Sequence, residues 1–188
     1  MNRSLKEKLK QNIWITRKCR INASERLLSH ARYIEILNVY YSIFVIILSL
    51  VSLTEQDNTL SIISLACSIA LTISIIYANA AGYRERSLSL KQNYIELQLL
   101  LDQLSCIHDE NKEIIMSISH QYAELLKSSE NHMPIDLYQL KASGVDADMT
   151  LSKKEKYGYY GQLAWRHLWR TILIFLPLAV AIFYFFKR

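Results

Sequence analysis

Glycine and proline are scarce in this chain of 188 residues, which contains 4 Gly and 2 Pro. An all-β fold needs a turn about every ten residues, and such turns depend on these residue types. A disordered chain rich in Gly and Pro would contain more of both. The shortage therefore favours a helical protein, and the length corresponds to one domain or two small ones.

Cysteine is also scarce, and its pattern excludes two kinds of site. Cys19, Cys67 and Cys106 lie far apart, without a CxxC pair. They predict free thiols in a reducing compartment, not a disulfide framework or a zinc site. No signal peptide is expected, because residues 1–35, which precede the first apolar run, are mostly polar.

Charged residues are absent from three long windows, which cover residues 36–54, 59–83 and 171–186. Crossing a bilayer core of about 30 Å takes roughly 20 apolar helical residues, and the first two windows provide them. The third window falls just short, but Trp165 and Trp169 before it match the aromatic belt of a membrane interface. The sequence predicts an all-α integral membrane protein, with a transmembrane helical hairpin at 36–83 and a C-terminal transmembrane or re-entrant segment at 165–188.

Lysine and arginine are unevenly distributed around these windows. The connection between the first two spans, residues 55–58, has no cation, whereas nine precede the first span and two follow the second: Arg3, Lys6, Lys8, Lys10, Arg17, Lys18, Arg20, Arg26 and Arg32, then Arg84 and Arg86. Because cations favour the cytoplasmic side, we expect a multi-pass membrane protein with a cytoplasmic N-terminus. The two cationic residues at 187–188 would then lie outside the cell membrane, which is contrary to the preference of cations for the cytoplasmic side. The net charge of +5 is explained by this topology and by contact with anionic lipid. We therefore expect no direct binding to nucleic acid.

The polar segments on the cytoplasmic side are expected to be helical. Residues 1–35 predict an amphipathic helix, in which Trp14 lies among cations. Two locations of this helix are considered. The helix lies on the membrane surface, or it packs on the rest of the cytoplasmic domain. Residues 84–140 predict a helical hairpin that continues from the transmembrane hairpin.

A seam pattern runs along the first helix of this cytoplasmic hairpin, before a break at 108–112. Its members follow at spacings of 4, 3, 4 and 3: Leu90, Tyr94, Leu97, Leu101 and Leu104. The spacing is that of a coiled coil between copies of the chain, but an intramolecular bundle uses the same pattern. Both alternatives remain open.

Residues 141–164 predict a linker. The part from 141 to 156 is polar and is interpreted as a loop. Gly158 and Gly161 then predict a flexible approach to the membrane.

Polar side chains form one narrow stripe on each of the first two spans. At 100° per residue the stripes comprise Asn38, Ser42, Ser49 and Ser52 on the first span, and Ser61, Ser64, Ser68, Thr72 and Asn79 on the second. Small polar residues allow close helix packing, and they also suit the lining of an aqueous path in an assembly of several copies. No charged residue lies inside any span, which argues against an ion-coupled pump.

Enzyme motifs are not found. The five histidines show no HExxH spacing, and there is no P-loop, dinucleotide-binding glycine set or nucleophile elbow. Neither a cofactor nor a metal is expected. The densest polar cluster, residues 129–136, either holds a ligand or ends a helix, with Asn131 as its C-cap before Pro134.

Several motifs resemble the SLATT family of bacterial two-span membrane proteins. Residues 13–27 lead directly into the hairpin, residues 83–86 follow it, and a Tyr-x-x-Leu helix and residues 129–132 come later. The third apolar segment is similar to a subgroup that accompanies reverse transcriptases. The positions that carry the resemblance include Trp14, Arg17, Arg26, Arg86, Glu130, Asn131 and His132.

This resemblance implies an oligomeric, pore-forming effector of a bacterial anti-phage or conflict system, located in the bacterial inner membrane. No sensing domain is recognised in the sequence, so the trigger is expected from a separately encoded sensor or a reverse-transcriptase-type partner. The alternative is a non-conducting scaffold that anchors a cytosolic partner to the membrane. The polar stripes favour the pore, and the absence of intramembrane charge favours the scaffold.

Overall fold

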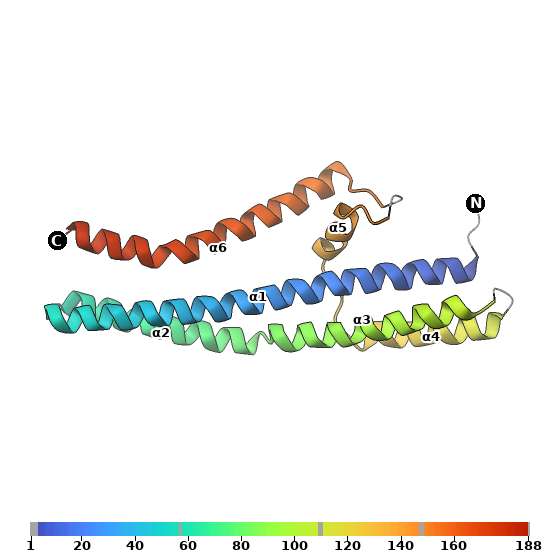
Figure 1. Cartoon of the computed structure of the whole chain (residues 1–188), viewed down its shortest axis with the longest axis horizontal. Helices are drawn as coiled ribbons and strands as arrows, with labels where there is room; N and C mark the ends of the chain where they lie inside the picture. Colours follow the sequence, from blue (N-terminus) through green and yellow to red (C-terminus); the bar gives the residue numbers. More distant parts are fainter. Residues whose placement is uncertain (1–3, 57, 109–110, 147–148, 188) are drawn as a thin grey trace. The chain divides into compact units, whose positions relative to one another are not determined.

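The computed structural model describes residues 4–56, 58–108, 111–146 and 149–187. Its regular structure in these residues is entirely helical (Figure 1): α1 (Leu5–Glu55), α2 (Asn58–Ala80), α3 (Tyr83–Cys106), α4 (Lys112–Lys127), α5 (Pro134–Ala142) and α6 (Lys153–Lys187). Three helical stretches are long and apolar enough to cross a membrane, namely Leu5–Glu55, Asn58–Cys106 and Lys153–Tyr184. The predicted all-α membrane protein is thus confirmed. Arg3, Asp57, Asp109, Glu110 and Arg188, which entered the predictions, lie outside the described residues.

The chain divides into two compact units. The first, which we call the bundle unit, combines Met1–Leu28 with Arg84–Tyr159. The second, which we call the membrane unit, combines Ser29–Tyr83 with Tyr160–Arg188 and contains the three charge-free windows. Helices α1 and α6 each contribute residues to both units.

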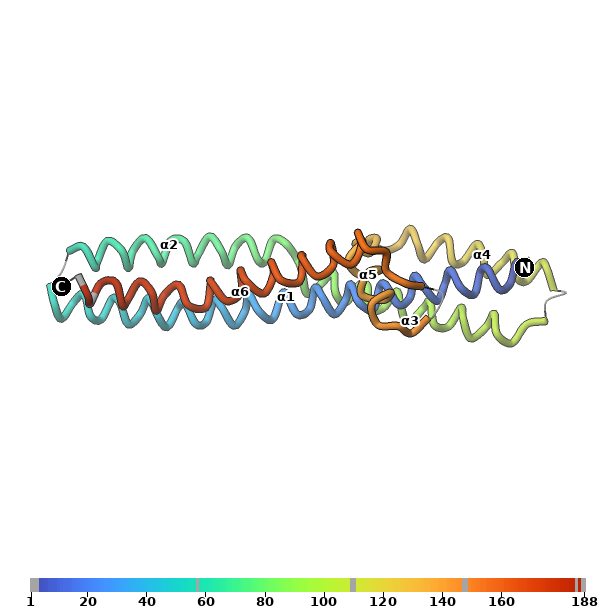
Figure 2. The backbone as a smooth tube through the Cα atoms, turned by 90° about the horizontal axis from the view of Figure 1, so that it is seen from above, coloured from blue at the N-terminus to red at the C-terminus, as the bar shows by residue number. Residues whose placement is uncertain are grey.

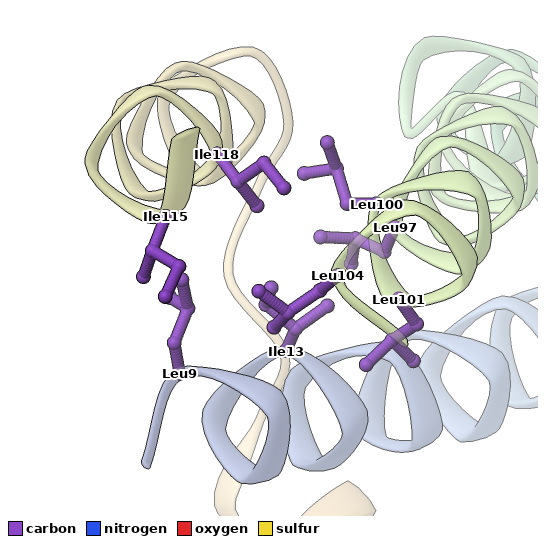
Figure 3. Packing of buried hydrophobic residues seen from close by; sticks show 8 residues of the cluster. All are labelled: Leu9, Ile13, Leu97, Leu100, Leu101, Leu104, Ile115 and Ile118. Atoms are coloured by element: carbon purple, nitrogen blue, oxygen red, sulfur yellow. The ribbon is translucent and has the colours of Figure 1, made fainter. Parts of the chain in front are cut away.

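The bundle unit has a core of aliphatic side chains from three helices (Figure 3): Leu9 and Ile13 of α1, Leu97, Leu100, Leu101 and Leu104 of α3, and Ile115 and Ile118 of α4. Trp14 packs against this core from the side. The apolar face of the N-terminal helix is therefore used in the bundle, which is the second of the two placements considered for it.

Three members of the predicted seam on α3, namely Leu97, Leu101 and Leu104, lie in the same core. Leu90, Leu97, Leu101 and Leu104 are buried and Tyr94 is half-buried within the single chain. The structure thus corresponds to the intramolecular alternative. These leucines are not available for a contact with another copy while the bundle is folded.

Two helix boundaries differ from the expectation. Helix α4 ends at Lys127 with Ser128 as its C-cap, three residues before Asn131, and a separate helix α5 begins at Pro134. Between α2 and α3, where a continuous helix was expected, Gly82 adopts a φ of 56°. This left-handed conformation suits glycine and ends the regular helix at Ala80.

Helix α6 begins inside the predicted linker, at Lys153, so Gly158 and Gly161 are helical. The cause is a capping box at residues 152–155. The Ser152 N–H donates to Glu155 Oε2 at 2.8 Å, and the Glu155 N–H donates to Ser152 Oγ at 3.3 Å. A hydrogen bond from Lys141 Nζ (2.6 Å), with the Ser152 N–H, lowers the pKa of Glu155 to about 2.

In the membrane unit, α1 contacts both α2 and α6 (Figures 1 and 2). The remaining faces of these helices carry exposed aliphatic and aromatic side chains, among them Ile36, Val39, Ile62, Ile73 and Phe183. Such a surface suits lipid tails and is rare on a soluble protein at this extent.

Candidate functional site

A buried ion pair joins α1 to α5 in the bundle unit. Asp136 is fully buried in the first turn of α5. Arg26 of α1 donates to both of its carboxylate oxygens, from Nε at 2.8 Å and from Nη2 at 3.1 Å. The Met133 N–H adds a third hydrogen bond at 2.8 Å. A buried carboxylate needs this degree of pairing, because its desolvation would otherwise disfavour folding.

Arg20 of α1 is also fully buried and holds the end of α4. Its guanidinium donates to Asn93 Oδ1 of α3 and to the carbonyls of Leu125 (3.0 Å) and Leu126 (3.4 Å). Asn93 Nδ2 donates to the Leu125 carbonyl as well, at 2.8 Å. These carbonyls have no helical donors at a C-terminus, where a cation is also favoured by the helix dipole. Burial lowers the pKa of Arg20, but an arginine stays charged at any physiological pH.

Helix α3 also binds the segment between α4 and α5. Arg86 forms a forked ion pair with Glu130, with Nε–Oε2 and Nη2–Oε2 distances of 3.0 and 2.7 Å. His132 in the same segment is half-buried. Burial lowers its pKa; the carboxylate of Asp136 opposes this and Arg20 adds to it. The segment from 125 to 136, which is bound by Arg20, Arg26 and Arg86, is called the arginine-held turn below.

In the membrane unit, serines join the two helices of the hairpin. Ser49 and Ser64 hydroxyls are 2.6 Å apart, and Ser52 and Ser61 hydroxyls are 2.5 Å apart. Beside this contact lies an open groove of about 350 Å³, lined by Val45, Leu53, Leu65 and five serines: Ser49, Ser52, Ser61, Ser64 and Ser68. The structure thus brings together the last two members of the first predicted stripe, Ser49 and Ser52, and the first two members of the second, Ser61 and Ser64.

The rest of the polar stripes lies outside this contact. Ser68, Thr72 and Asn79 are exposed on α2. Thr72 Oγ1 donates to the Ser68 carbonyl at 2.9 Å, and Ser42 Oγ of α1 donates to the Asn38 carbonyl at 2.8 Å. Hydroxyls bonded one turn back in this way are compatible with an apolar environment.

Three tyrosines of α1 bind the backbone of α6 within the membrane unit. Tyr33 donates to the Arg170 carbonyl at 3.0 Å, and Tyr40 and Tyr41 donate to the carbonyls of Ile174 (3.1 Å) and Leu173 (2.8 Å).

The Tyr41 contact replaces a hydrogen bond that α6 lacks. Pro177 of α6 has no N–H, so the Leu173 carbonyl four residues before it has no helical donor. Tyr41 provides one, which a carbonyl in an apolar environment requires.

The match to a known family covers nearly the whole chain. The model of family 5 of the SMODS and SLOG-associating 2TM effector domains matches residues 2–184. The chain belongs to the SLATT family. No curated protein and no solved structure matches it.

The motif residues of this SLATT chain fall into two groups. Arg26, Arg86, Glu130 and His132 meet at the arginine-held turn. Asn131 lies in the same turn but is exposed. Trp14 and Arg17 lie elsewhere on α1: Trp14 packs on the core, with Lys18 Nζ 5.9 Å from its ring centre, and Arg17 is half-buried.

The sequence did not single out three important residues of the SLATT bundle unit, namely Arg20, Asn93 and Asp136, although Asp136 lies in the polar cluster at 129–136. Arg20 stood in the quoted motif beside Arg17, with no local signal to distinguish a buried arginine from an exposed one. Asp136 had a signal, because an acidic residue two positions after a helix-initiating proline is typical of an N-terminal capping position.

Proposed function

We propose that this SLATT protein is an oligomeric pore-forming effector of the bacterial inner membrane, which depolarises the membrane and arrests or kills the cell in an anti-phage or conflict response. The groove of five serines beside the α1–α2 contact carries the proposal. Hydroxyl groups can replace part of the water shell of an ion, and one of the five serines, Ser68, is exposed on α2. Neighbouring copies would close this face into an aqueous path.

The contacts of the bundle unit support the orientation. Arg26 and Asp136 lie in segments before and after the hairpin and are directly paired. Both segments must therefore lie on one side of the membrane, as two crossings require. The excess of cations before the first span favours the cytoplasm for that side.

In the cell a separate sensor provides the trigger in this proposal, and at high copy number the pore opens without it. The family is described as associating with SMODS and SLOG modules, and a reverse-transcriptase-type partner is the other candidate. The bundle unit is the part of the chain that a cytosolic partner can reach.

Conductance of the purified protein in a planar bilayer tests the proposal. Ser68→Leu and Thr72→Leu should abolish the current and the toxicity of overexpression, because branched apolar side chains in a narrow path favour dewetting. Ser68→Ala is the matched control and should retain both. Normal currents through the leucine variants would contradict the lining.

A scaffold that does not conduct is the second candidate, and one observation favours it. The Ser49–Ser64 and Ser52–Ser61 hydrogen bonds use these hydroxyls for packing. In that case the wild-type protein carries no current at any copy number, whereas its bundle unit still recruits a cytosolic partner to membranes.

A further inference from the structure

Helix α3 carries a second apolar stripe that the fold leaves exposed. Leu88, Ile95 and Leu99 have exposed fractions of 60%, 48% and 57%, and Cys106 is exposed as well. At 100° per residue these four positions lie within about 40° of arc, on the side of α3 opposite the core. They belong to the bundle unit, outside the charge-free windows, where three large apolar side chains face water. An aligned stripe of this kind marks an interaction surface.

The spacing of the stripe indicates a helix as its partner. The successive intervals from Leu88 to Ile95, Leu99 and Cys106 are 7, 4 and 7 residues. With Gln92 and Asp102 between them, the positions follow the 4, 3 alternation of a coiled-coil seam. The other seam of α3, through Leu97 and its neighbours, is filled inside the chain, so this outer one is available.

The charges beside the stripe select a parallel copy of the same helix. Lys91 and Glu96 flank the stripe on its two sides, five residues apart. In a parallel, in-register pair, Lys91 of one copy faces Glu96 of the other, and the reverse contact forms by symmetry. Copies inserted in one membrane in the same orientation have parallel α3 helices. We propose that the outer face of α3 is the seam by which neighbouring copies of this protein associate, and this rests on the oligomer of the proposed function.

Two polar residues within the seam limit its strength, and the Asp102 carboxylates of two copies in register repel each other. Gln92 and Asp102 occupy positions where apolar residues would pack more tightly. Gln98 donates to Asp102 at 2.7 Å, and Gln92 donates to Glu96 at 3.3 Å, within one helix. The seam is therefore suited to reversible association.

The native Cys106 offers a direct test in the full-length protein. In-register pairing places Cys106 of adjacent copies opposite each other, within disulfide reach. Oxidation with copper phenanthroline in membrane vesicles should give a cross-linked dimer. Cys106→Ser should abolish this product and Cys67→Ser should not. Absence of the product in wild-type vesicles would overturn the parallel, in-register seam.

Charge reversal tests the register independently. Lys91→Glu or Glu96→Lys should each lower the Cys106 cross-linking yield by about twofold, as expected for an exposed ion pair. The double reversal should restore the yield, because the pair is re-formed with exchanged signs. Two single variants with wild-type yield would contradict the pairing.

The oligomer mass separates this inference from the proposed pore. Leu99→Asp should lower the mass in nanodiscs while preserving the circular dichroism spectrum, because Leu99 is exposed in the single chain. Met116→Asp is the matched control, because Met116 is an equally exposed apolar residue of the same unit on α4, away from the stripe. Unchanged mass and current in Leu99→Asp would refute the seam and leave the pore intact. Cross-linking at Cys106 without any current would support the seam and refute the pore.

Discussion

Asp136 is the residue on which the arginine-held turn depends most. Asp136→Asn should lower the free energy of unfolding by about 3–5 kcal/mol, because it leaves Arg26 without its carboxylate. Chemical denaturation of the purified protein measures this loss. Glu124→Gln removes an exposed ion pair with Lys127 and is the control. Equal midpoints for the two variants would mean that the buried pair does not stabilise the bundle.

His132 should make stability depend on pH. Its pKa is lowered from the usual 6.5, first by burial. The unfolded chain therefore binds a proton more readily than the folded one, so stability is lost as the pH falls below about 6.5. The unfolding midpoint should rise between pH 5.5 and 7.5, and His132→Gln should reduce this rise. A variant with the full pH dependence would assign it to another group.

At the scale of helices, the Tyr41–Leu173 contact predicts an energetic coupling to Pro177. Tyr41→Phe should destabilise the membrane unit by about 0.5–2 kcal/mol, because the Leu173 carbonyl loses its donor. In a Pro177→Ala background the same change should have little effect, since residue 177 then donates to Leu173 itself. Unfolding in bicelles with increasing SDS, followed by tryptophan fluorescence, measures the double-mutant cycle.

Tyr40→Phe is the matched control for this cycle. Tyr40 donates to the Ile174 carbonyl, and the helical donor for that carbonyl is Leu178, which has an N–H in either background. The cost of Tyr40→Phe should therefore be the same with Pro177 or with alanine. Identical coupling for both tyrosines would show that Pro177→Ala acts by repacking α6 instead.

Some helices could be predicted from the sequence and others could not. The membrane hairpin was evident from charge-free windows, since lipid excludes charge over a known length. The start of α6 was missed because Gly158 and Gly161 were interpreted as flexible, although the capping box at Ser152 and Glu155 is a local signal. The burial of Arg20 could not be predicted, because its partners lie 73 to 106 residues away in the sequence.

For the whole molecule, the topology is the most direct prediction. In a Cys67→Ser, Cys106→Ser background, Asn58→Cys and Phe186→Cys should react with an impermeant maleimide from the periplasm, and Lys154→Cys only after lysis. Cys19 can remain, because burial, together with the charge of Asp136, raises its pKa to about 12 and the thiol is unreactive. Labelling of residue 186 from the cytoplasm would show that α6 is re-entrant and does not cross the membrane.

The split composition of the bundle unit has a consequence for biosynthesis. Residues 1–28 leave the ribosome long before residues 84–159, with both membrane crossings between them. Until Asp136 is made, Arg26 has no carboxylate to bind, and Leu9 and Ile13 have no core to join. A nascent chain that inserts only one crossing separates the two halves across the bilayer and cannot assemble the bundle. The bundle can therefore fold only after both crossings have been inserted, and a chain with one crossing leaves Leu9 and Ile13 without their core.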